Sequence, residues 1–156
     1  MKLYAMRHCE ALSSLDDPLR ALSSKGRREA IVMADYLSSQ EAQIAHVLHS
    51  PKLRTKQTAE IIALALPIDK ITACDTLLNE EMDVMPLVDM IEQWHTDTLL
   101  VGHMPFIPRL IASLSQTNVE AVMQNFITGT CVCLERHDSG LWQQQWRHSP
   151  GDVKAV

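Results

Sequence analysis

Three short segments of this chain place imidazole and guanidinium groups where they suit phosphoryl chemistry. Arg7 and His8 follow one apolar run. Arg54 lies shortly after a second run, and His103 follows a third. A guanidinium group binds two phosphoryl oxygens at once, and a histidine donates to such an oxygen or attacks phosphorus through an unprotonated nitrogen. Because phosphoryl transfer depends mainly on positioning and charge neutralisation, the three segments predict a phosphoryl site.

Each of these segments follows a run that is typical of a buried strand. Strands are predicted over residues 2–6, 44–49, 71–74 and 98–101. Between them, apolar side chains recur at three- and four-residue spacing, and Ser23 is suited to begin the first helix. These patterns predict helices over residues 24–39, 53–66, 84–94 and 107–114. Runs over residues 130–136 and 141–147 flank a glycine turn and predict a β-hairpin.

The order of these elements predicts the fold class. Strands that alternate with helices favour a three-layer α/β/α sandwich with a mostly parallel central sheet, and the hairpin adds an antiparallel C-terminal edge. The 156 residues have single-domain length, so we expect one domain over residues 1–156 without a cap insertion. Ligands of such sheets bind beyond the carboxyl ends of the strands, where the arginines and histidines are predicted to lie.

Composition excludes several classes of protein. The chain is 46% hydrophobic and 21% charged, as in ordinary globular proteins, and its net charge of −5 disfavours general nucleic-acid binding. Its apolar runs fall short of the roughly 20 residues of a membrane-spanning helix, and the N-terminus does not resemble a secretory signal. The four cysteines form no CxxC motif. We therefore expect a cytoplasmic protein in a reducing compartment, with no nucleic-acid or membrane partner.

Four motifs, in order along nearly the whole chain, resemble those of the histidine phosphatase superfamily, also called the phosphoglycerate mutase-like superfamily. Residues 7–10, Arg-His-Cys-Glu, are similar to its Arg-His-Gly signature, and residues 22–26, Leu-Ser-Ser-Lys-Gly, to its Leu-Thr-x-x-Gly. Residues 50–58 are similar to its Ser-Pro-x-x-Arg-Thr-x-Gln-Thr, and residues 99–103 resemble its last active-site strand and histidine. The short length, the loop at 16–20 and the tail at 149–156 look most like SixA-type phosphohistidine phosphatases.

The resemblance implies a role for each key residue. His8 is implied to be the nucleophile that becomes phosphohistidine, with Arg7 and Arg54 clamping the phosphoryl oxygens. A protonated His103 completes the site, whereas His8 has to be neutral at its attacking nitrogen. Arg20 is a further candidate for substrate binding. No carboxylate cluster with metal-ligand spacing accompanies these residues, so we expect no metal and no other cofactor.

Cys9 departs from the superfamily signature, which has glycine at this position. Glycine there would permit a positive φ or a close approach of the backbone to phosphate, so the loop geometry is the feature in question. Two interpretations of Cys9 are open: a small buried filler, or a redox switch.

The general acid is a second open point. Glu80 or Glu81 lies in the segment where many superfamily members carry a carboxylate that protonates the leaving group, and the alternative is a solvated loop. Glu10 is a further candidate, or it orients neighbouring arginine or histidine side chains. A departing imidazole needs less help from an acid than an alkoxide does, so weak acid machinery fits phosphohistidine.

We expect a metal-independent phosphohistidine phosphatase that acts on a phosphohistidine-bearing signalling or phosphotransfer protein domain through a covalent phosphohistidine enzyme. The alternatives are a small-molecule phosphomonoesterase of the same superfamily and a noncatalytic phosphoprotein-binding module. A mutase is disfavoured because no further basic motif marks a second phosphate position. A basic cluster of Arg20, Lys25, Arg27 and Arg28 is either a solvated face or a guide for an anionic partner. We expect a monomer.

Overall fold

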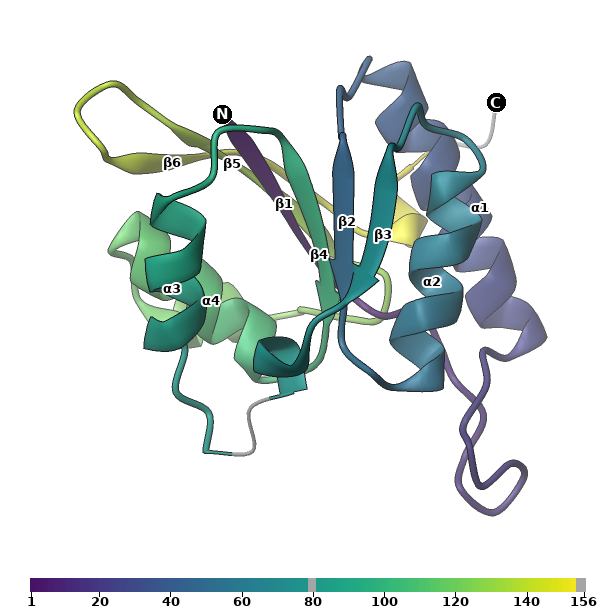
Figure 1. Ribbon diagram of the computed structural model, residues 1–156. Coiled ribbons are helices and arrows are strands. Elements are labelled where there is room, and N and C mark those ends of the chain that lie inside the picture. Colours follow the sequence, from purple (N-terminus) through teal and green to yellow (C-terminus); the bar gives the residue numbers. More distant parts are fainter. Residues whose placement is uncertain (79–80, 154–156) are drawn as a thin grey trace.

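A six-stranded mixed sheet forms the middle layer of the structure, with helices on both of its faces (Figure 1). The computed structural model describes residues 1–78 and 81–153. The strands are β1 (Lys2–Arg7), β2 (His46–His49), β3 (Lys70–Ala73), β4 (Thr98–Gly102), β5 (Cys131–Arg136) and β6 (Trp142–His148). They lie in the order β3-β2-β4-β1-β5-β6. The first four are parallel and the β5–β6 hairpin is antiparallel, which confirms the predicted fold class.

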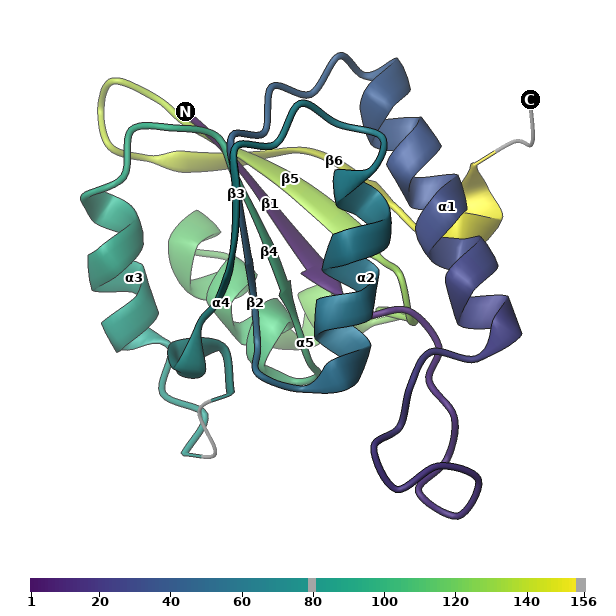
Figure 2. The same cartoon turned by 45° about the vertical axis from the view of Figure 1, so that its right-hand side comes forward.

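The helices divide between the two faces of the sheet (Figure 2). One face carries α1 (Ser24–Ser39) and α2 (Leu53–Ala63). The other carries α3 (Met85–Glu92), α4 (Phe106–Ser115) and the short α5 (Val119–Met123). Two 3₁₀ turns, η1 (Asp75–Leu78) and η2 (Pro150–Asp152), complete the described elements. No helix in the described part of the chain is both long and apolar enough to cross a membrane.

Both faces of β1 are buried, because its side chains alternate between two hydrophobic clusters. Leu3 and Ala5 pack into the cluster beneath α3 and α4, and Tyr4 and Met6 into the cluster beneath α1 and α2. The neighbouring β4 is buried at every residue. Parallel strands that are covered on both faces form a rigid centre, and their carboxyl ends hold whatever follows them in fixed positions.

Helix boundaries follow the predictions with one clear exception. Ser23 caps α1 as predicted, because its side chain accepts a hydrogen bond of 3.0 Å from the Gly26 amide. The helix predicted to reach residue 66 instead ends at Ala63. There the amide of Leu64 donates to the Ile61 carbonyl, a tighter turn, and the Leu64 side chain is 89% exposed. Leu66, beyond the end of the helix, still packs partly against the core. The sequence pattern also missed α5 and both 3₁₀ turns, which are too short to show a period.

Candidate active site

The register of the central strands brings the predicted segments together. Arg7 at the end of β1 pairs with Gly102 at the end of β4, and Val101 of β4 pairs with His49 at the end of β2. The residues that follow these strands, His8, Ser50 and His103, therefore lie side by side. Main-chain hydrogen bonds extend the pairing, from the His8 amide to the Gly102 carbonyl at 2.9 Å and from the Ser50 amide to the Val101 carbonyl at 3.1 Å.

A cavity of about 480 Å³ opens at this edge of the sheet, and we call it the arginine–histidine cavity. The four key residues predicted from the sequence, Arg7, His8, Arg54 and His103, all line it, and so does the further candidate Arg20. Apolar side chains from η1 and from the start of α4, including Leu77 and Phe106, form the opposite wall. A small polar cluster against an apolar wall is typical of a ligand site.

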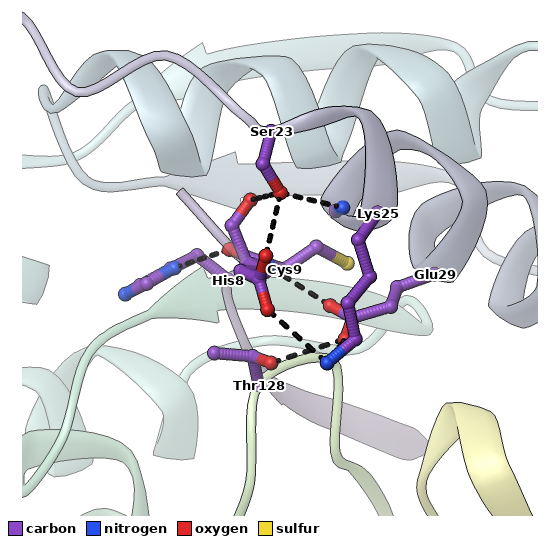
Figure 3. Close-up of polar contacts among 8 residues, drawn as sticks. His8, Cys9, Ser23, Lys25, Glu29 and Thr128 are labelled. Carbon is purple, nitrogen blue, oxygen red and sulfur yellow. Dashed lines mark hydrogen bonds and ion pairs between the residues drawn. The ribbon is translucent and has the colours of Figure 1, made fainter. Parts of the chain in front are cut away.

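His8 is held with one ring nitrogen free. Its Nδ1 lies 2.7 Å from the carbonyl oxygen of Cys9, and a carbonyl only accepts, so Nδ1 carries the proton (Figure 3). In the neutral ring Nε2 is therefore unprotonated and nucleophilic. Burial is the main cause that lowers the pKa of His8 to about 4, and the charges of Arg54 and Arg7 add to it. The ring is consequently neutral near neutral pH.

His103 is oriented by a chain of hydroxyl groups. Its Nε2 lies 2.6 Å from Ser50 Oγ, which lies 2.8 Å from Thr55 Oγ1. The Thr55 hydroxyl donates to the main-chain carbonyls of Ser50 and Lys52, both at 2.8 Å. Its proton is therefore engaged, so Ser50 donates to Thr55 and accepts from His103 Nε2–H. This arrangement leaves Nδ1 of the neutral His103 ring as the free nitrogen.

The protein's own groups favour the neutral form of His103 as well. Burial, followed by the charge of Arg54, lowers its pKa to about 3. The protonated His103 that the family resemblance implies therefore needs an additional negative charge beside the ring, such as a phosphoryl group would bring. The two imidazoles are close enough for one such group to touch both, since their ring centroids are 5.3 Å apart.

The arginines carry unused hydrogen-bond donors. Arg7 Nη1 donates to the carbonyl of Phe126 at 2.8 Å, which fixes this side chain. The Nε atoms of Arg7 and Arg54 are buried, and neither has a hydrogen-bond partner within the described part of the chain. A buried donor without a partner costs about 1–3 kcal/mol. Two such donors at one cavity indicate a ligand that supplies several acceptor oxygens.

Arg20 reaches the cavity from a loop between β1 and α1. It adopts a left-handed backbone conformation with φ of 51°, and its Nε donates to the Leu12 carbonyl at 3.0 Å. The carboxylate of Asp17 accepts hydrogen bonds from the amides of Leu19 and Ala21, on either side of Arg20. Because the arginine is held by these bonds, it contributes a fixed positive charge to the cavity.

Cys9 fits the loop without strain. It is not among the described non-glycine residues with positive φ, and its amide donates to Thr58 Oγ1 at 3.1 Å. The side chain is completely buried, and burial raises the pKa of the thiol far above its ordinary value. A thiol that does not ionise is a poor redox centre, so the structure favours the filler interpretation over the switch.

Gly26 explains the glycine of the second motif. A Cβ at this position would lie 1.9 Å from the carbonyl oxygen of Glu10, which is far inside van der Waals contact. Only glycine lets α1 pack directly against the main chain of the loop that carries His8.

The carboxylates give the cavity no obvious proton donor among the described residues. Glu80 lies outside the described residues, and Glu81 is exposed and absent from the described lining of the cavity. Glu10 lines the cavity, but its carboxylate accepts from Ser23 Oγ at 2.9 Å and forms an ion pair of 3.1 Å with Lys25. These contacts, the serine hydrogen bond first, lower the pKa of Glu10, so it is ionised near neutral pH and cannot donate a proton.

Glu29 is a structural residue of the site that sequence reasoning missed. One carboxylate oxygen accepts the Glu10 amide at 2.8 Å, and the other accepts the Thr128 hydroxyl at 3.3 Å (Figure 3). It is 9% exposed and joins α1 to two segments that line the cavity. The available signal was its position on the buried face of the helix, three residues after Gly26 and directly before Ala30.

Comparison with known proteins agrees with this geometry. The family model of the histidine phosphatase superfamily (branch 1) matches residues 3–83, just over half of the chain. The phosphohistidine phosphatase SixA of Escherichia coli K12 is 28% identical over 99% of this chain and 97% of its own.

Solved structures give the same result. A structure of the protein histidine phosphatase SixA complexed with tungstate superposes with a TM-score of 0.84 and 27% identity over 99% of this chain and 100% of that one. A putative SixA from Agrobacterium tumefaciens, at 23% identity over 96% of this chain and 97% of its own, shares the fold with a TM-score of 0.78. Since the family model, the fold and the convergent strand ends agree, the chain belongs to the histidine phosphatase superfamily.

Proposed function

We propose that this phosphatase removes the phosphoryl group from phosphohistidine on a signalling or phosphotransfer protein, through a covalent intermediate on His8. One observation carries the proposal: a neutral His8 presents an unprotonated Nε2 beside two arginines whose buried Nε donors lack partners in the described structure. A noncatalytic binding module would need the donors but not the nucleophile. The full-length similarity to a phosphohistidine phosphatase supports the substrate class.

In the first step, Nε2 of His8 attacks phosphorus. The new P–N bond forms as the P–N bond of the substrate breaks, and the substrate ring, protonated on its second nitrogen, leaves as neutral imidazole. Arg7 and Arg54 neutralise the three non-bridging oxygens, and His103 donates to one of them. The Cys9 carbonyl stabilises the positive charge that His8 acquires, since it accepts the Nδ1 proton.

In the second step, water attacks the phosphorus of the phosphoenzyme. The P–N bond to His8 breaks, its electron pair returns to Nε2, and inorganic phosphate leaves with both protons of the water. His8 is then neutral again, with its proton on Nδ1.

The carboxylates favour phosphohistidine over a phosphomonoester. An alkoxide leaving group needs a proton donor, and among the described residues Glu10 is held ionised while Glu81 is exposed. A protonated imidazole leaves without one. We further propose that the chain is a single domain without a cap. Cytoplasmic location, monomeric state and metal independence stay predictions.

The test is phosphate release from a phosphohistidine-bearing phosphotransfer domain in the presence of a chelator, with wild type and His8→Ala compared. Rapid release by wild type, loss of more than a thousandfold in the variant and a phosphoryl group on His8 in quenched wild type are expected. Release by His8→Ala within tenfold of wild type would remove His8 as the nucleophile. Faster hydrolysis of small phosphomonoesters than of the phosphoprotein would favour the phosphomonoesterase alternative.

A further inference from the structure

A second groove of about 460 Å³ lies next to the arginine–histidine cavity, and we call it the basic groove. It runs between residues 18–20 of the β1–α1 loop and residues 51–56 at the start of α2. The two hollows share Arg20 and Arg54. Whatever is bound in the basic groove is therefore a direct neighbour of a group held in the arginine–histidine cavity.

The charge of the basic groove is of one sign. The whole chain has a formal net charge of −5, yet the charged residues in the described lining of the groove are all cations: Arg20, Lys52, Arg54 and Lys56. In the described part of the chain, Lys56 alone among these four forms an ion pair, with the exposed Glu60 at 3.9 Å. An exposed pair at that distance cancels little of the field.

The groove does not coincide with the basic cluster expected from the sequence. Lys25 of that cluster is paired with Glu10, and Arg27 and Arg28 are exposed on α1. Lys52 and Lys56, which are four residues apart near the start of α2, take their place beside Arg20. The basic groove is thus a second basic site, which no sequence motif predicted.

One wall of the groove is a loop held in a fixed shape. Ala11 and Leu22 form an isolated bridge at its base, and the Leu12 amide donates to the Ala21 carbonyl at 2.8 Å. Within it, Asp17 and Arg20 make the hydrogen bonds described above. The loop extends beyond the body of the molecule at the edge where the strands end (Figures 1 and 2). It leaves Leu19, which lines the groove beside the cations, 72% exposed.

We infer that the basic groove binds an acidic segment of the substrate protein that flanks its phosphohistidine. This inference rests on the proposed function, because it assigns the phosphoryl group to the arginine–histidine cavity. The shared arginines require that the occupant of the groove be attached close to the phosphoryl group. Its charge has to be negative to match a groove whose charged lining residues are all cations, and a polypeptide is long enough to fill both hollows.

The test uses two synthetic phosphohistidine peptides of equal length, one with glutamate and one with glutamine at the flanking positions. Each exposed charge pair is worth up to about threefold to fivefold in affinity. Wild type should therefore hydrolyse the glutamate peptide with a kcat/KM about tenfold higher, mainly through KM. In Lys52→Gln/Lys56→Gln the ratio should fall to within twofold, because these lysines are the two cations of the groove that are not shared with the arginine–histidine cavity. Hydrolysis of the glutamine peptide should be unchanged, because neither lysine lines that cavity. High salt should narrow the wild-type ratio in the same way.

The matched control is Lys2→Gln/Lys70→Gln, which removes two exposed lysines at the starts of β1 and β3, the opposite edge of the sheet. It should keep the tenfold ratio. Hydrolysis of neither peptide by wild type would overturn the proposed function and this inference with it. Hydrolysis without charge preference, or a preference that survives in Lys52→Gln/Lys56→Gln, would overturn this inference alone. The rate of the glutamine peptide reports whether the double variant is folded.

Discussion

The rings of His8 and His103 lie with centroids 5.3 Å apart and planes inclined by 59°, and each has one nitrogen fixed by the protein. For His8 the partner is a main-chain carbonyl, and for His103 it is the Ser50 hydroxyl. The nitrogens left over, Nε2 of His8 and Nδ1 of His103, are those available to a phosphoryl group. The pair thus offers a nucleophile and a latent proton donor within the reach of one small anion.

Removal of the Ser50 hydroxyl should impair catalysis without removing a residue that touches substrate. Ser50→Ala leaves His103 Nε2–H without its acceptor, and a buried donor without a partner costs about 1–3 kcal/mol. If the whole of this free energy is lost from the stabilisation of the transition state by His103, kcat/KM drops by about 5- to 150-fold. Steady-state kinetics checks this, with the exposed Ser39→Ala as control. A rate equal to wild type would show that Ser50 does not orient His103.

Stability should fall as the solution becomes acidic. The folded-state pKa values of His8 and His103, about 4 and about 3, are lower than the value near 6.5 of an unfolded histidine. Below about pH 6.5 the unfolded chain therefore binds protons that the folded chain does not, and unfolding is favoured. Each histidine adds a slope of up to about 1.4 kcal/mol per pH unit.

Urea denaturation at pH 7 and pH 5 measures this effect. His8→Asn should show a smaller loss of the free energy of unfolding between the two pH values than wild type, whereas the exposed His137→Asn should behave like wild type. Equal losses in His8→Asn and wild type would contradict a neutral, buried His8.

An oxyanion should stabilise the folded protein through the unused arginine donors. A ligand at 100 times its Kd stabilises by about 2.7 kcal/mol, which corresponds to a rise in Tm of about 5–10 °C for a chain of this length. Tungstate or inorganic phosphate should give such a rise in wild type, measured by differential scanning fluorimetry. Arg54→Met should abolish most of it, whereas Arg109→Met, which removes an exposed arginine of α4 that does not line the cavity, should not.

Glu29 should stabilise the protein mainly through the two hydrogen bonds that its carboxylate oxygens accept, and less through its charge. Glu29→Ala leaves the Glu10 amide and the Thr128 hydroxyl unpaired, so we expect a loss of about 1–3 kcal/mol in the free energy of unfolding and a lower kcat. Glutamine retains an acceptor for the amide and a polar group for the threonine. Glu29→Gln should therefore lie within about 1 kcal/mol of wild type. Glu29 also forms an ion pair of 4.0 Å with Lys25, and similar losses in both variants would point to that ion pair instead.

Even alanine, the residue with the smallest side chain, should destabilise the protein at position 26. In Gly26→Ala the new Cβ meets the Glu10 carbonyl oxygen, a main-chain atom that cannot turn aside. We expect α1 to shift away from the loop that carries His8, with a loss of more than about 3 kcal/mol in stability and a large fall in kcat. Ser24→Ala, two residues earlier and exposed, is the control. Wild-type stability in Gly26→Ala would mean that α1 does not press on this loop.

Much of the site was predictable because it lies where parallel strands end. The arginines and histidines of the three segments lie at or shortly after the ends of β1, β2 and β4. The register of these adjacent strands then brings the side chains together. The supporting contacts were not predictable in the same way. The Arg7 side chain is held by the carbonyl of Phe126, 119 residues further along the chain, and main-chain groups carry no residue-type signal. The contacts of the Glu10 carboxylate with Ser23 and Lys25 were likewise not predictable, because they depend on how closely α1 packs against the loop that carries Glu10.

The carbonyl that fixes the His8 ring belongs to the main chain of residue 9, and this has a consequence for how the protein tolerates change. Substitution of a side chain cannot delete a carbonyl. Any residue that fits the buried space at position 9 and keeps the backbone conformation supplies the same acceptor, so a cysteine in place of the glycine of the superfamily signature is compatible with this tautomer of its neighbour. The tautomer of His8 is thus insensitive to substitution of the side chain at the very next residue.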